Sequence, residues 1–283
     1  MRMGKLLDSA DVARFHRDGY VTGVPVLRSE EVADLVTRME AFEAERPGDL
    51  PWAFDIKANL LFDWVYELGR HARLLDAIED LVGPDILMTN AVFRNKNPGS
   101  AIDYGWHQDS ARIEVTPFFA IAYVALSDAS ADNGCLRIIP GTHDRVRPFT
   151  VTEAPGQLRR LVARVKDVDE TAAVDLHLRP GEAAIFHSNA VHGSAPNRSS
   201  RRRMALLYDY TPASARQNLG RGSGQLVRGT DRWQHFGAEP VPEPGLTERN
   251  VLARRAILTT YPENVLMGPR LPGVPVTFPD RPS

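Results

Sequence analysis

The chain has 283 residues and a formal net charge of −2 at pH 7, with 43% hydrophobic and 25% charged residues. This composition is typical of an ordinary globular protein, and the length suits one hydrophobic core with decorations. Because there is no basic excess, we expect neither a nucleic-acid partner nor attraction to an anionic membrane. Cys135 is the single cysteine, which excludes an intrachain disulfide and a zinc site built on several thiolates.

The N-terminal segment becomes polar before it accumulates an apolar stretch long enough for a signal peptide. No stretch approaches the roughly 18 consecutive apolar residues of a transmembrane helix. We therefore expect a cytoplasmic protein without a membrane partner. The sequence carries no signal for the oligomeric state.

The first 84 residues are expected to be mainly helical. Apolar residues recur there at helical spacing, which predicts helices at about 9–15, 29–44, 59–70 and 72–82. Asp8 or Ser9 would cap the first helix, and Gly83 with Pro84 would end the last one. An apolar run at 20–27 predicts a strand between the first two helices.

From residue 85 the pattern changes to short β-prone runs separated by Gly, Pro, Asn and Asp. These runs lie at 86–96, 118–126, 135–141, 174–178, 182–187 and 204–210. Several short strands without helical periodicity between them predict an antiparallel sandwich or barrel. The fold class is therefore mainly β, with a jelly-roll core over 85–212 and flanking helices that are mostly N-terminal.

The remaining segments are predicted to be irregular. The polar segment 153–173 is typical of a long loop with about one helical turn. Residues 213–283 are rich in Gly, Pro and Arg and are expected to form a lid and a C-terminal tail, with a short helix near 247–257. Together with the helical part and the core, they make one domain over 1–283.

A histidine and an aspartate one residue apart suggest a metal site. His107 and Asp109 face the same side if the segment is extended, because residues two apart in a strand share a face. His192 begins a small polar loop and is the best third ligand; two histidines and one carboxylate form the facial triad of non-haem Fe(II) oxygenases. His187 competes, but if the segment stays extended it is an odd number of residues from His192 and would face the opposite side.

Three blocks in the right order carry a family resemblance. They are WHQDS at 106–110, DNGCL with PGTH at 132–143, and HGSAPN with a later arginine at 192–203. Over about residues 10–212 the chain resembles the phytanoyl-CoA dioxygenase family of Fe(II)/2-oxoglutarate-dependent oxygenases. The resemblance implies a double-stranded β-helix, which is a cupin-like jelly roll with helices packed outside.

The resemblance also implies roles for individual residues. It assigns the iron to His107, Asp109 and His192, which would be the catalytic and metal-binding residues. Ser194 and Lys96 match positions that can touch the cosubstrate in relatives.

An arginine on the strand after the third block is implied to pair with the distal carboxylate of 2-oxoglutarate. Arg201, Arg202 and Arg203 are all available, and the family spacing favours Arg203. A planar guanidinium can bind a carboxylate through two parallel hydrogen bonds.

The implied cofactors are Fe(II), 2-oxoglutarate and O2, and the implied reaction hydroxylates an aliphatic C–H bond of a small molecule with release of succinate and CO2. Such chemistry belongs to natural-product biosynthesis or catabolism. Asp109 occupies the position that is a small residue in halogenating relatives, so halogenation is disfavoured. Desaturation, epoxidation and cyclisation use the same triad.

Two other classes of protein remain open. A cupin-like metal enzyme that does not use 2-oxoglutarate predicts that Arg203 is dispensable. A non-catalytic jelly-roll binding module predicts no Fe(II) binding.

Several side chains are candidates for the substrate pocket or its lid because they lie near the triad or in the irregular C-terminal segment. They are Tyr104, Trp106, Arg112, Phe119, Trp233 and His235. Arg94 and further arginines predict a positive pocket for a substrate carboxylate or phosphate.

Overall fold

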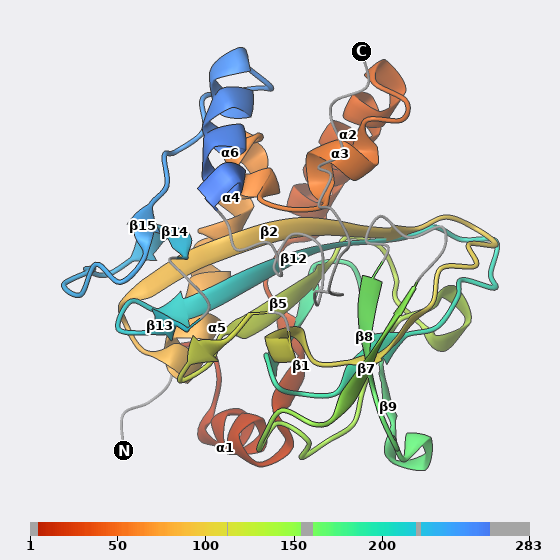
Figure 1. Cartoon of the computed structure of the whole chain (residues 1–283). Helices are drawn as coiled ribbons and strands as arrows, with labels where there is room; N and C mark the ends of the chain where they lie inside the picture. The colour runs from red at the N-terminus through yellow and green to blue at the C-terminus, as the bar shows by residue number, and fades with distance from the viewer. Residues whose placement is uncertain (1–4, 112, 154–160, 219–221, 261–283) are drawn as a thin grey trace.

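Two β-sheets facing one another form the body of the protein (Figure 1). The computed structural model describes residues 5–111, 113–153, 161–218 and 222–260. In spatial order, the large sheet contains β1 (Tyr20–Pro25), β10 (Glu182–His187), β5 (Ala120–Ala125), β12 (Arg203–Pro212), β2 (Ile86–Lys96), β14 (Ser223–Arg228) and β15 (Gly237–Ala238). The small sheet contains β3 (Tyr104–His107), β11 (His192–Ser194), β6 (Leu136–Ile138) and β9 (Val174–Leu176). The double-stranded β-helix expected from the sequence is confirmed.

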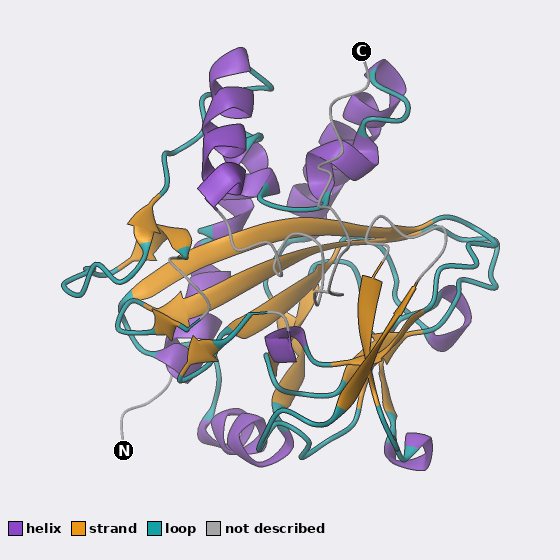
Figure 2. Cartoon of the chain, in the orientation of Figure 1, coloured by secondary structure: helices purple, strands orange, loops and turns teal. Residues whose placement is uncertain are grey.

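The helices pack mostly on the outer face of the large sheet (Figure 2). They are α1 (Ser9–Asp18), α2 (Ser29–Glu45), α3 (Leu50–Phe54), α4 (Asp63–Gly69), α5 (Ala72–Val82) and α6 (Glu248–Thr260). Asp8 caps α1 by accepting hydrogen bonds from two backbone N–H groups. None of the described helices is both long and apolar enough to cross a membrane.

Alternation along β12 separates the two environments of the large sheet. Met204 and Leu206 pack in the core between the sheet and the helices. The hydroxyl groups of Tyr208 and Tyr210, on the same face, donate to α4 carbonyls at Val65 and Gly69. The alternate residues of β12 therefore face the space between the two sheets.

Two segments differ from the sequence-based expectation. Part of the polar segment 153–173 is a strand, β8 (Leu161–Val165), which pairs antiparallel with β7 (Phe149–Glu153). The expected helical turn is the short 3₁₀ helix η4 (Glu170–Ala172). The segment after residue 212, expected to form a lid and a tail, also contributes a strand to the large sheet, because β14 pairs with β2. The tail beyond residue 260 lies outside the described residues.

Candidate metal centre

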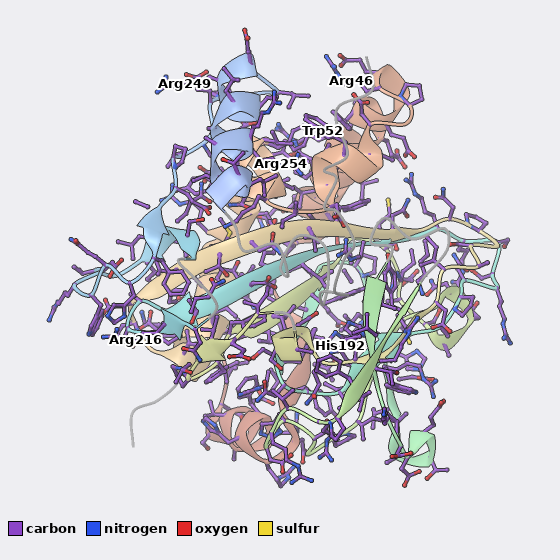
Figure 3. All side chains as sticks on the ribbon, in the orientation of Figure 1. Arg46, Trp52, His192, Arg216, Arg249 and Arg254 are labelled. Atoms are coloured by element: carbon purple, nitrogen blue, oxygen red, sulfur yellow. The ribbon has the colours of Figure 1, made fainter. Side chains whose placement is uncertain are left out.

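Three side chains meet between the two sheets. His107 ends β3, His192 begins β11, and the two residues are direct partners in the antiparallel pairing of these strands. Asp109 opens the 3₁₀ helix η2 (Asp109–Ala111), so the chain leaves the sheet between the first histidine and the carboxylate. Figure 3 places His192 on the opposite side of the large sheet from Trp52 and Arg254.

The distances between these groups suit one shared metal ion. The Nε2 atoms of His107 and His192 lie 3.8 and 3.5 Å from the carboxylate oxygens of Asp109. One ligand atom from each residue lies within 4.8 Å of the others. Ligands that are each roughly 2 Å from a common ion lie roughly 3–4 Å apart.

Backbone carbonyls fix both imidazole tautomers. The Nδ1 atom of His107 lies 2.7 Å from the Gly105 carbonyl oxygen, and that of His192 lies 3.0 Å from the Ala190 carbonyl oxygen. A carbonyl can only accept, so each Nδ1 carries a proton, and a neutral ring then leaves its Nε2 lone pair available for a metal ion. This is the tautomer that a metal-binding histidine needs.

His187 faces away from the cluster, although the spacing argument does not apply, because a turn separates the end of β10 at His187 from the start of β11 at His192. Its ring stacks on Phe118 at a centroid distance of 4.4 Å, and its Nδ1 accepts a hydrogen bond from the Asn189 N–H. Burial, helped by the charges of His143 and His16, lowers the pKa of His187 to about 4.

Arg203 and Tyr123 bring unused polar groups to the same cavity. The Arg203 guanidinium is 1% exposed, and its Nη1 donates to the Gly134 carbonyl oxygen at 2.7 Å and to Ser194 Oγ at 3.2 Å. Within the described part of the chain, Arg203 Nε and the Tyr123 hydroxyl are buried and have no hydrogen-bond partner. Unsatisfied buried donors are costly, so a carboxylate bound here would complete the site.

Ser194 lines the cavity, whereas Lys96 lies behind it. Lys96 is fully buried, and its Nζ donates to the Ser194 hydroxyl at 2.8 Å and to the carbonyl oxygens of Ser194 and Ala195. Burial, together with the charge of Arg203, lowers the pKa of Lys96 to about 7. Lys96 therefore supports Ser194, whose hydroxyl also accepts a hydrogen bond from Arg203.

The two neighbouring arginines point elsewhere. Arg201 pairs with Asp132 at 3.1 Å on the surface. Arg202 forms two hydrogen bonds with the carboxylate of Glu43, at 2.6 and 3.0 Å. Of the three consecutive arginines, Arg203 is the one that lines the cavity.

The pocket expectations are met in part. Tyr104 and Phe119 line the cavity, which has a volume of about 160 Å³. Trp106 does not line it and lies under the Arg137 guanidinium, 5.1 Å from its ring centroid. Trp233 and His235 do not line the cavity either, whereas the neighbouring residue Phe236 does. Arg112 lies outside the described residues.

Sequence reasoning missed several polar residues of the cavity. They are Asp55, Thr89, Asn90, Arg164, Asp209 and Gln217. The signal for Asp209 was present, because it lies an even number of residues after Arg203 on one strand and so shares its face. No comparable pattern marks Asp55, which follows the short helix α3 in a loop.

The fold and the cluster together define a cupin-like jelly-roll protein with a candidate metal centre of two histidines and one aspartate. The family described as phytanoyl-CoA dioxygenase (PhyH) matches residues 15–205. The chain therefore belongs to the phytanoyl-CoA dioxygenase family.

Curated relatives agree with this family. The human peroxisomal phytanoyl-CoA dioxygenase is 27% identical over 169 residues, covering 56% of this chain and 50% of that protein. A probable alpha-ketoglutarate-dependent hypophosphite dioxygenase of Stutzerimonas stutzeri is 30% identical over 170 residues, covering 58% of this chain and 59% of that protein. The chain thus spans about half the length of the curated relatives it matches.

Solved structures share the fold over most of the chain. A non-heme monooxygenase, ThoJ, is 27% identical with a TM-score of 0.79, and the match covers 91% of this chain and 98% of that one. CytC3 with Fe(II) and alpha-ketoglutarate is 23% identical with a TM-score of 0.61, covering 85% of this chain and 98% of that one.

Proposed function

We propose that this protein is an Fe(II)- and 2-oxoglutarate-dependent dioxygenase that hydroxylates an aliphatic C–H bond of a small molecule, with release of succinate and CO2. One observation carries the proposal: Arg203 and Tyr123 line the same cavity as the His/Asp/His cluster, and each has a buried polar atom without a hydrogen-bond partner among the described residues. The 2-oxo acid end of 2-oxoglutarate can bind a metal and its distal carboxylate can bind a buried cation, and this cavity offers both kinds of partner.

The ligands of the iron would be His107, Asp109 and His192. Each histidine offers the Nε2 lone pair that its backbone hydrogen bond leaves available, and Asp109 adds a negative charge. The two imidazoles and one carboxylate leave part of the coordination sphere for a cosubstrate and dioxygen. Because a carboxylate is present at Asp109, we do not expect halogenation.

Arg203 would hold the distal carboxylate of 2-oxoglutarate, with Tyr123 donating a further hydrogen bond. Ser194 keeps the guanidinium in place through its hydroxyl, which also donates to the Gly134 carbonyl oxygen at 2.8 Å. Iron with bound 2-oxoglutarate and dioxygen supplies the oxidising power. The protein positions the reactants, and the apolar side chains of Val92, Leu207 and other lining residues exclude water.

The test is an anaerobic titration of the iron-loaded protein with 2-oxoglutarate, followed by the visible charge-transfer band of the chelated cosubstrate. We expect a band in the natural protein and none in His107→Ala. His187→Ala is the matched control, because this histidine stacks on Phe118 outside the cavity and should leave the band intact. Iron binding without a band would favour a metal enzyme that does not use 2-oxoglutarate, and no iron binding would favour a non-catalytic module.

A further inference from the structure

One edge of the small sheet lies beside the cavity and has no paired neighbour strand in the described part of the chain. β3 is the edge strand, and its partner in the sheet is β11. β8 lies next to β3, but it forms its ladder with β7. Backbone pairing therefore does not close the gap between β3 and β8, and side chains must do so.

Arg164 of β8 fills this gap. A Cβ at Gly105 on β3 would lie 2.1 Å from Arg164 Nη1 and 2.8 Å from its Cζ, so the guanidinium rests on the Gly105 backbone. Its Nη2 also donates to the Asp103 carbonyl oxygen at 3.2 Å. Gly105 is not one of the glycines with a positive φ, so the close approach of Arg164 is what favours glycine at this position.

Arg164 stands between two hollows. It lines the cavity of the His/Asp/His cluster and also a second hollow, which contains Trp106 and Arg137. Trp106 alternates with His107 along β3, so the second hollow lies on the outer side of the small sheet. Ser194 lines both hollows and accepts a hydrogen bond from Arg203. The second hollow therefore reaches the end of the cavity at which the cosubstrate is expected.

The position of β8 depends on such side-chain contacts. The β7–β8 pair is a two-stranded sheet of its own, and an isolated pair of strands is only marginally stable. Val162 and Ala163 of β8 line the cavity, but the large apolar clusters on the two faces of the large sheet are built from other residues. Loss of the contact between Arg164 and Gly105 would therefore let β8 move away from β3.

We propose that the gap between β3 and β8 is a side entrance through which 2-oxoglutarate enters and succinate leaves, and that Arg164 keeps it closed by resting on Gly105. This inference rests on the proposed function, because it takes the Arg203 end as the place of the cosubstrate. Arg164 is then a positioning residue, since it acts on the entrance and not on the reacting atoms. An entrance of this kind changes how fast a ligand exchanges and leaves its bound state unchanged.

The test measures the exchange of 2-oxoglutarate by stopped flow. The anaerobic Fe(II) protein is mixed with increasing 2-oxoglutarate, and the growth of the charge-transfer band gives the association and dissociation rate constants. In Arg164→Ala we expect both rate constants to rise by a similar factor, about threefold or more, so that the dissociation constant stays nearly the same.

Two further variants sharpen this test. Arg179→Ala is the matched control, because its guanidinium pairs with Glu182 on the surface and should leave both rate constants unchanged. Gly105→Ala displaces the Arg164 guanidinium by a methyl group and should reproduce the effect of Arg164→Ala. The double variant should show no further rise, because both substitutions remove one contact. If Arg164→Ala does not fold, Gly105→Ala decides alone.

Several results would overturn the inference. Unchanged rate constants in Arg164→Ala would do so, as would an equal rise in Arg179→Ala or an additive effect in the double variant. A rise in the dissociation rate constant alone would show that Arg164 binds 2-oxoglutarate directly.

Hydrogen exchange separates this inference from the proposed function. In the metal-free protein, the amides of residues 161–165 should exchange about tenfold faster in Arg164→Ala than in the natural protein, while those of β12 stay unchanged. A missing charge-transfer band in the natural protein would refute the proposed function, and unchanged exchange at 161–165 would then still refute the role of Arg164. A normal band with unchanged rate constants would refute only the side entrance.

Discussion

Replacing Arg203 by glutamine should weaken 2-oxoglutarate binding by a factor of roughly 10² while the protein stays folded. The guanidinium is buried and its Nε has no partner among the described residues, so a carboxylate gains charge-assisted hydrogen bonds there. Each such bond contributes about 1.5–3 kcal/mol, and a neutral amide can replace part of this. A net loss of about 3 kcal/mol corresponds to that factor in the dissociation constant.

The fold should tolerate the change because the groups around Arg203 keep other partners. Ser194 Oγ still accepts from Lys96 Nζ at 2.8 Å and still donates to the Gly134 carbonyl oxygen. Thermal unfolding would check that the variant is folded before the titration is interpreted.

The assay is the anaerobic titration of the Fe(II) protein with 2-oxoglutarate, read from the charge-transfer band. Arg202→Gln is the matched control, because its guanidinium binds Glu43 outside the cavity. The reasoning is refuted if Arg203→Gln binds 2-oxoglutarate as tightly as the natural protein. It is equally refuted if Arg202→Gln shows the same loss.

Three further predictions concern stability. The pKa of His187 falls to about 4 in the fold and is about 6.5 in an unfolded chain. The free energy of unfolding should therefore fall as the pH drops from about 6.5 to about 4. Urea denaturation would show this fall, and an equally steep fall in His187→Phe would contradict the prediction. Gly134→Ala should destabilise the fold by about 2 kcal/mol and weaken 2-oxoglutarate binding. The reason is that Gly134 has φ +76° and a Cβ would lie 2.3 Å from the Ala195 carbonyl oxygen. An unchanged melting temperature would refute this prediction. Glu239→Gln removes the carboxylate that pairs with the fully buried Lys57, and urea denaturation should show a loss of about 3 kcal/mol in the free energy of unfolding. A loss below about 1 kcal/mol would show that the ion pair contributes little to stability.

Many of the helices and strands could be predicted from the local spacing of apolar residues in the sequence. The predicted strand at 86–96 is β2, and the two helices expected to part near residue 70 are α4 and α5. The hairpin of β7 and β8 was missed because its second strand lies within a polar stretch where turn residues dominate the pattern. The pairing of β14 with β2 was missed because it joins segments more than 100 residues apart, which no local pattern records.

The candidate metal ligands were easier to predict than the other polar residues of the cavity. Motif spacing predicted that His107, Asp109 and His192 share one metal site, and in the structure their side chains lie within reach of one ion. Asp55 comes from a loop beside α3, and its place near Arg94 depends on how that loop packs against β2. Such a contact is fixed by tertiary packing rather than by the pattern of neighbouring residues.

The two sheets contribute different residues to the cavity, so a change on one sheet need not disturb the residues on the other. His107 and His192 lie on the small sheet, where carbonyl groups of their own segments fix the ring tautomers. Asp209 lies on the large sheet, six residues from Arg203, in a row that contacts neither histidine through strand pairing. A substitution at Asp209 should therefore leave in place the backbone groups that orient the metal ligands.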